Sequence, residues 1–225
     1  MANDWKTLQP EAVIFDFDGV IVDTEPLHYR AFQRILEPLG LGFSWPEYQE
    51  TYMGFDDRDA FVEAFSSSGK SLSDKHLAAL VNEKANIFQE VIRDGVVSYP
   101  GVKELVINLH TLRIPLAICS GALLSDILPI LDTLGIRNFF TIIVTADDVK
   151  KSKPDPESYL LAYRRLMETI SAPAPDLRAI AIEDTPAGIA SATGAGLPVL
   201  AVTNSYPREQ LLKASFIVDS LSELL

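Results

Sequence analysis

Six short apolar segments, most of them alternating with helical patterns, constrain the fold of this chain more than any other feature. They cover residues 13–17, 115–120, 141–145, 179–183, 198–202 and 216–218. Strands that alternate with helices form βαβ units, whose parallel sheet is buried on both faces and is therefore apolar throughout. We predict an α/β protein built on a doubly wound parallel sheet.

The segment 24–97 interrupts this alternation, because its apolar residues recur at helical spacing and it contains no convincing strand. Ser44 and Glu47 form a capping-box pattern ahead of one of its helices. We interpret the segment as an all-helical insertion after the first strand. The predicted domains are a core formed by residues 1–23 and 98–225 and an inserted helical domain formed by residues 24–97.

Charge and hydropathy argue against several classes of partner. The 225 residues include 31 acidic and 19 basic residues, which gives a net charge of −12. Such a surface repels nucleic acid and anionic membranes, since both bind clustered Lys and Arg. No apolar run approaches the roughly 20 residues of a membrane-spanning helix, and the first residues lack the apolar core of a secretory signal. We expect a soluble, cytoplasmic protein, with a monomer as the default.

Asp16 and Asp18 stand at the end of the first apolar segment. Residues i and i+2 of a strand lie on the same side, so both side chains are expected to project beyond the carboxyl end of that strand. A bound hard cation would offset the repulsion between them. A plain strand followed by an Asp-Gly turn would give the same local pattern, so the pair needs support from elsewhere in the chain.

Polar residues follow three more of the predicted strands. Ser120 and Gly121 follow the second strand at the expected start of a helix, Lys153 comes after the third, and Glu183 and Asp184 close the fourth. Each set has a structural alternative, as helix caps or as a loop ahead of a helix. Ligands of an open parallel sheet bind beyond the carboxyl ends of its strands. Four such sets at corresponding places therefore indicate one catalytic site.

These residue types suit phosphoryl transfer. A carboxylate nucleophile divides the hydrolysis of a phosphate ester into the formation and the hydrolysis of an aspartyl-phosphate. Mg²⁺ prefers oxygen ligands and keeps several waters, so two or three protein groups suffice to hold it, and it reduces repulsion between carboxylate and phosphate. A hydroxyl, backbone amides and an ammonium can bind the phosphate oxygens, while a second carboxylate serves as general acid and base.

The motifs resemble those of the haloacid dehalogenase superfamily. They are DFDGVIVDTE at residues 16–25, Ser-Gly at 120–121, Lys-Pro at 153–154 and EDTPAG at 183–188. The resemblance covers nearly the whole chain and implies a Rossmann-like core. The helical insertion looks like the small cap domain of the branch that contains β-phosphoglucomutase and many sugar-phosphate phosphatases.

The resemblance implies a role for each matched residue. Asp16 would be the nucleophile and Asp18 the general acid and base. Mg²⁺ would be held by the Asp16 carboxylate, the Asp18 carbonyl and Asp184, with Glu183 assisting directly or through water. The implied phosphate ligands are Ser120, Gly121 and Lys153. The resemblance also implies a catalytic role for Lys153. Dehalogenases of this fold lack the second aspartate and need no metal, so the sequence favours a phosphatase acting on a small phosphorylated metabolite.

A β-phosphoglucomutase-type hexose-phosphate mutase is the alternative. His28 matches a hinge-region histidine of the mutase, and Arg58 resembles a cap arginine that grips a distal phosphate or sugar, although both also suit exposed helical positions. Met53 stands where the mutase pattern has a lysine, and Leu123 and Leu124 stand where it has polar residues. These departures favour hydrolysis. A non-catalytic binding module would be expected to carry a damaged motif, and all four motifs are intact.

Overall fold

The computed structural model describes residues 9–53, 55–93, 95–170 and 178–225. The first eight residues, for which no secretory signal is expected, lie outside this part of the chain. The chain divides into two compact units. We call Met1–Asp23 together with Val97–Leu225 the core unit, and Thr24–Val96 the helical unit.

The core unit is built on a six-stranded parallel sheet. Its strands are β1 (Ala12–Phe15), β2 (Leu116–Cys119), β3 (Phe140–Val144), β4 (Ala179–Glu183), β5 (Val199–Val202) and β6 (Phe216–Val218). Their order is β3-β2-β1-β4-β5-β6, with every neighbouring pair parallel. The strand order reverses between β1 and β4, which is the switch point at which such sheets bind ligands. The predicted doubly wound α/β fold is confirmed.

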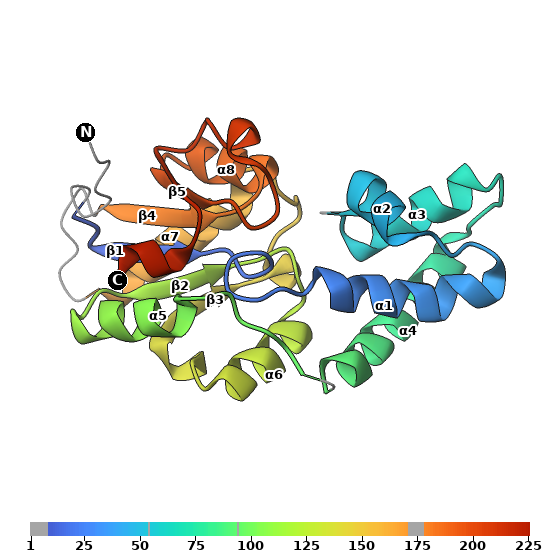
Figure 1. Ribbon diagram of the computed structural model, residues 1–225, viewed down its shortest axis with the longest axis horizontal. Coiled ribbons are helices and arrows are strands. Elements are labelled where there is room, and N and C mark those ends of the chain that lie inside the picture. The colour runs from blue at the N-terminus through green and yellow to red at the C-terminus, as the bar shows by residue number, and fades with distance from the viewer. Residues whose placement is uncertain (1–8, 54, 94, 171–177) are drawn as a thin grey trace. The chain divides into compact units, whose positions relative to one another are not determined.

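Helices cover both faces of this sheet, which explains why its central strands are apolar throughout. They are α5 (Val102–Thr111), α6 (Leu124–Leu134), α7 (Glu157–Thr169) and α8 (Pro186–Gly194). Figure 1 shows α8 on one side of the strands and α5 and α6 on the other. On the α8 side, Tyr159 and Leu166 of α7 and Ile189 of α8 join a buried cluster. Small strand residues such as Ala117 and Ala181 belong to the same cluster and allow close packing.

The helical unit contains α1 (Glu25–Leu36), α2 (Trp45–Glu47), α3 (Asp57–Ser67) and α4 (Asp74–Ile92). The predicted capping box is confirmed, because the Ser44 side chain accepts from the Glu47 N–H and the Glu47 side chain accepts from the Ser44 N–H. The helix that it starts is short and continues as one π-helical stretch, Tyr48–Tyr52. The described residues of this unit form no strand.

Aromatic side chains form much of the core of the helical unit. Phe61 of α3 is fully buried, and its ring meets that of Phe32 on α1 edge to face at 5.2 Å between centroids. The rings of Phe43 and Tyr52 stack at 4.2 Å in the same cluster. Such pairs add to the free energy that burial of their large apolar surfaces contributes.

Phe61→Ala should destabilise the helical unit by about 3–5 kcal/mol, because it removes a buried ring and leaves a cavity. Phe55 is 46 % exposed, so Phe55→Ala is a matched control that should change stability by about 0.5 kcal/mol or less. Denaturant unfolding of both variants, followed by circular dichroism, measures the difference. An equal decrease in the free energy of unfolding of both variants would show that Phe61 is not part of the packed core.

Candidate active site

Asp16 lies one residue beyond β1, at the carboxyl edge of the sheet. The preceding residue, Phe15, pairs with Ile182 of β4. The Asp16 N–H donates to the Ile182 carbonyl at 2.9 Å, so the parallel register continues for one more residue. Asp16 is therefore level with Glu183, the last residue of β4, and the switch point brings two carboxylates together.

Asp18 lies in a turn and not on the strand. The prediction that the first strand reaches residue 17 is wrong, because β1 ends at Phe15. The chain turns back beyond Phe17, whose carbonyl accepts from the Val22 N–H at 3.2 Å. Strand alternation alone therefore does not orient Asp18. The Ser120 hydroxyl, from the end of β2, lies 3.4 Å from Asp18 Oδ2 and donates to it.

The Lys153 ammonium links two of the carboxylates. Its Nζ lies 2.9 Å from Asp16 Oδ1 and 2.7 Å from Glu183 Oε1. It also donates to the Cys119 carbonyl at 3.1 Å, so all three of its N–H donors have partners. Burial alone would lower the pKa of Lys153, but the Asp16 and Glu183 carboxylates raise it well above its ordinary value. Lys153 therefore stays charged in this site.

Glu183 is fully buried and held from several sides. The Tyr159 hydroxyl donates to Oε1 at 2.8 Å, while the Thr185 hydroxyl and the Asp184 N–H donate to Oε2 at 3.3 and 3.2 Å. A Cβ on Gly188 would overlap the Glu183 carboxylate, so α8 passes directly against this side chain. The small residues of α8 therefore allow this helix to pack against the acids and to hold them in place.

Asp184 completes a buried acidic cluster. Ligand oxygens of Asp16, Glu183 and Asp184 lie within 4.8 Å of one another. The Ser205 hydroxyl donates to Asp184 Oδ2, whereas Asp184 Oδ1 is buried without a hydrogen-bond partner among the described residues. Three carboxylates against one ammonium, with one oxygen unsatisfied, form a donor set that suits a hard divalent cation.

Burial and crowding raise the pKa values of these acids. Burial, reinforced by the nearby Glu183 carboxylate and partly offset by Lys153, raises the pKa of Asp16 to about 7. Burial and then the Asp16 carboxylate raise the pKa of Asp184 well above its ordinary value. A cation that reached the cluster would favour the ionised acids and displace protons.

Ser120 and Gly121 do not start a helix, contrary to the expectation from the sequence. Helix α6 begins at Leu124, because the Ser120 hydroxyl accepts the Ala122 N–H at 2.9 Å and the chain bends before the helix. Gly121 is exposed in this bend, and a Cβ there would meet nothing within 4 Å. The bend therefore leaves open space around Gly121, next to the buried Ser120.

The two residues expected to contact substrate from the helical unit differ in their surroundings. His28 on α1 is half-buried, its Nδ1 lies 2.7 Å from Lys84 Nζ, and its ring stacks on Phe88 at 4.3 Å. Lys84 is 1 % exposed and pairs with Asp57 Oδ1 at 2.7 Å. Arg58, next to Asp57 in the first turn of α3, is exposed. His28 thus belongs to a partly buried polar cluster with Lys84 and Asp57, and the roles of His28 and Arg58 toward a substrate stay predictions.

Two groups of residues around the acids were missed by the sequence analysis. Tyr159 has the spacing of an ordinary core residue of α7, and its hydroxyl gave no separate signal. Asn204 and Ser205 lie two and three residues beyond the end of β5, so the same strand-end argument that identified the other sets could have found them. They escaped because polar residues after a strand are also typical of a turn.

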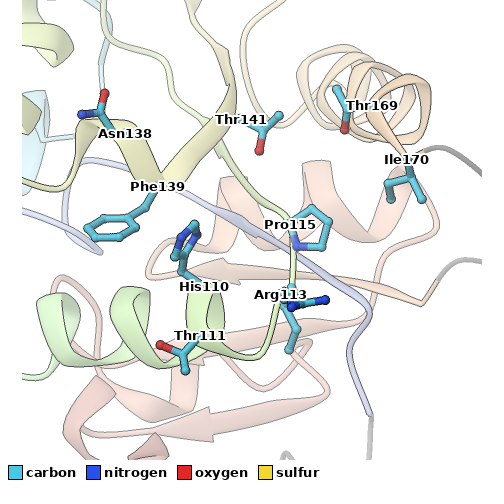
Figure 2. Close-up of a pocket in the computed structure, with 10 residues that line it drawn as sticks. His110, Thr111, Arg113, Pro115, Asn138, Phe139, Thr141, Thr169 and Ile170 are labelled. Atoms are coloured by element: carbon cyan, nitrogen blue, oxygen red, sulfur yellow. The ribbon is translucent and has the colours of Figure 1, made fainter.

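A cavity of about 620 Å³ lies elsewhere in the core unit. Figure 2 shows its lining, which includes His110, Arg113, Pro115 and Phe139. Pro115 and Phe139 directly precede β2 and β3, so the cavity is at the amino ends of these strands. The acids of the candidate site, at the carboxyl ends, are not among its lining residues.

Comparison of the sequence with known protein families identifies a family whose model spans the motif residues of this site. The model of the haloacid dehalogenase-like hydrolase family matches residues 13–202. The chain belongs to this family. That assignment confirms the resemblance drawn from the motifs. Among the described residues, no helix combines the length and the apolar character needed to cross a membrane.

Relatives in this family include enzymes named as phosphatases. A phosphorylated carbohydrates phosphatase of Thermotoga maritima is 32 % identical over 83 % of this chain and 82 % of its own. The fructose-1-phosphate phosphatase YqaB of Escherichia coli is 29 % identical over 84 % of this chain and 95 % of its own.

Solved structures of similar fold cover almost the whole chain. CbbY from Rhodobacter sphaeroides, in complex with phosphate, has a TM-score of 0.84 at 27 % identity over 96 % of each chain. A β-phosphoglucomutase from Clostridium difficile has a TM-score of 0.81 at 27 % identity over 96 % of this chain and 93 % of its own.

Gly188→Ala should displace the Glu183 carboxylate and destabilise the core unit by about 1–3 kcal/mol, the usual cost of overpacking. Gly194→Ala in the same helix is the milder comparison, since its Cβ would lie 3.3 Å from the Pro156 ring, a tight contact, and not 2.0 Å from a carboxylate. Thermal unfolding of the two variants measures the difference. If Gly188→Ala were as stable as Gly194→Ala, the close contact between α8 and Glu183 would be refuted.

Proposed function

We propose that this protein is a Mg²⁺-dependent phosphatase that hydrolyses a small phosphorylated metabolite through an aspartyl-phosphate on Asp16. The observation that carries the proposal is the buried cluster of Asp16, Glu183 and Asp184 with Lys153 between two of its carboxylates. Relatives named as phosphatases of phosphorylated carbohydrates and of fructose 1-phosphate support a sugar phosphate as the substrate.

The acidic cluster is the proposed metal site. The carboxylates of Asp16 and Asp184 and the Asp18 carbonyl would hold Mg²⁺, with Glu183 assisting directly or through water. The unpartnered Asp184 Oδ1 supports this assignment, because a buried carboxylate oxygen without a partner is costly. When bound, Mg²⁺ reduces repulsion between the carboxylates and the dianionic phosphate.

Lys153, Ser120 and the Gly121 amide are the proposed phosphate ligands. Lys153 Nζ is already 2.9 Å from Asp16 Oδ1, so its charge lies where a phosphoryl group attached to Asp16 would carry its oxygens. The bend at residues 120–122 offers the Ser120 hydroxyl and, beside it, the exposed Gly121, which has no side chain to cover its amide. Fixed donors of this kind stabilise charge that develops in the transition state.

Asp18 is the proposed general acid and base. In the first step an Asp16 oxygen bonds to phosphorus, the ester P–O bond breaks, and the protonated Asp18 gives its proton to the leaving alkoxide. In the second step the Asp18 carboxylate takes a proton from water, whose oxygen bonds to phosphorus and releases inorganic phosphate from Asp16. The Ser120 hydroxyl, which donates to Asp18 Oδ2, helps to orient this side chain.

Asp16→Asn should lower phosphate release from p-nitrophenyl phosphate and from a panel of sugar phosphates by roughly three orders of magnitude or more, because it removes the nucleophile. Treatment of the wild type with EDTA should also abolish turnover. Asp132→Asn is the matched control, since Asp132 is an exposed partner of Arg137 on the surface. Undiminished turnover in Asp16→Asn or in EDTA would refute the mechanism.

Mg²⁺ affinity should increase with pH. The Asp16 pKa near 7 in the metal-free protein means that this carboxyl holds a proton below about pH 7 and must lose it to ligate a cation. The Asp16 proton alone gives a rise in affinity of roughly 10-fold between about pH 6 and pH 8, with net proton release, and the raised pKa of Asp184 acts in the same direction. Calorimetric titration in buffers with different ionisation enthalpies measures both. An affinity independent of pH would contradict the assignment of Asp16 as a ligand.

The mutase alternative is supported by the structural similarity to β-phosphoglucomutase. The apolar Met53, Leu123 and Leu124 argue against it, because a mutase must grip a bisphosphate in two orientations. Incubation with β-glucose 1-phosphate and trace glucose 1,6-bisphosphate separates the two. Isomerisation without phosphate release would replace the phosphatase proposal with the mutase.

A further inference from the structure

We infer that Asn204 and Ser205, at the carboxyl end of β5, are positioning residues of the proposed metal site. The inference rests on the proposed function only in requiring that the acidic cluster binds Mg²⁺. It adds a fifth strand end to the site, beyond the four that the sequence motifs identify. Neither residue belongs to those motifs, and neither is among the proposed ligands of the metal or of the phosphate.

Ser205 orients the Asp184 carboxylate. Its hydroxyl donates to Asp184 Oδ2, and Oδ1 is then the oxygen left without a partner among the described residues. Asp184 is 1 % exposed, so bulk solvent has little access to either oxygen. A hydrogen bond to one oxygen of a ligating carboxylate fixes the rotation of the group and so aims the other oxygen at the cation.

Asn204 fixes the turn that carries Asp18. Its Nδ2 donates to the Gly19 carbonyl at 2.7 Å. That carbonyl belongs to the Gly19–Val20 peptide, while the Gly19 N–H of the preceding Asp18–Gly19 peptide donates to the Val22 carbonyl at 2.9 Å. The two hydrogen bonds thus hold the peptides on both sides of the Gly19 Cα, and the Asp18 carbonyl, which is part of the first of them, is restricted in the direction in which it points.

Gly19 shows how closely the three strand ends meet. It has φ +79°, and a Cβ there would overlap the Asp184 carboxylate and lie 2.8 Å from Ser205 Oγ. The turn after β1, the end of β4 and the segment after β5 are therefore in direct contact. A shift of the Ser205 side chain would change the position of the Asp184 carboxylate.

The segment after β5 is held independently of these contacts. The Thr203 hydroxyl donates to Asp219 Oδ1 at 3.1 Å, and Arg208 donates to the same oxygen at 2.8 Å. Removal of the Ser205 hydroxyl should therefore leave the segment in place. The substitution should change the orientation of the Asp184 carboxylate and leave the fold unchanged.

Ser205→Ala tests the inference most directly. Mg²⁺ affinity, measured by calorimetric titration without substrate, should fall by about 10–100-fold, the usual effect of removing a partner of a metal ligand. The thermal unfolding midpoint of the metal-free protein should stay close to that of the wild type. At saturating Mg²⁺ the kcat of Ser205→Ala should return toward the wild-type value, which a damaged fold would not allow.

Two further variants complete the test. Asn204→Ala should also weaken Mg²⁺ binding, by about 10-fold, since it frees the turn that carries the Asp18 carbonyl. Ser222→Ala is the matched control, because Ser222 is exposed and lies in the C-terminal 3₁₀ helix, Leu221–Leu224. This control should bind Mg²⁺ as the wild type does.

The outcomes distinguish this inference from the proposed function. Wild-type Mg²⁺ affinity in both Ser205→Ala and Asn204→Ala would overturn the positioning roles and leave the phosphatase proposal standing. Weakened binding in these variants, with no phosphatase activity in the wild type, would support the positioning roles and reject the phosphatase. A wild type that bound no Mg²⁺ would overturn both.

Discussion

The buried contact of the Lys153 ammonium with the carboxylates of Asp16 and Glu183 is the interaction on which the candidate site depends. Burial of an ion costs several kcal/mol unless other groups compensate it. The parallel register brings Asp16 level with Glu183 at the switch point, and Lys153 and the Tyr159 hydroxyl then offset part of the negative charge. The charge that remains uncompensated is the physical reason why a divalent cation suits this cluster.

The acids can pack this tightly only because two nearby residues lack a side chain. The carboxylates of Asp184 and Glu183 occupy the space in which a Cβ of Gly19 or Gly188 would stand. Gly19 also has a positive φ, which a residue with a Cβ rarely adopts. The glycines of the first and last motifs are therefore steric requirements of the acidic cluster, and they connect the sequence directly to the geometry of the site.

The sequence predicts the strands well and the contacts between strand ends only in part. All six strands were predicted, because a parallel strand buried on both faces is a continuous apolar run. The same reasoning placed Asp16 and Glu183 at one edge. It misplaced Asp18 and the start of α6, because local hydrogen bonds of the turns decide where a strand ends and a helix begins. Tyr159 and Ser205 act through contacts between distant segments, which periodicity does not reveal.

The helical unit adds an electrostatic argument for hydrolysis over transfer between two phosphate positions. A bisphosphate needs additional cationic groups to hold its second phosphate. The buried ammonium of Lys84 is paired within this unit with Asp57 at 2.7 Å, so its charge is already compensated. Met53 adds no charge, whereas the exposed Arg58 is the residue that the mutase alternative would use to hold a second phosphate. Under the proposed function, the paired Lys84 and the uncharged Met53 favour a substrate with one phosphate, and Arg58 is the cation that a second phosphate would use.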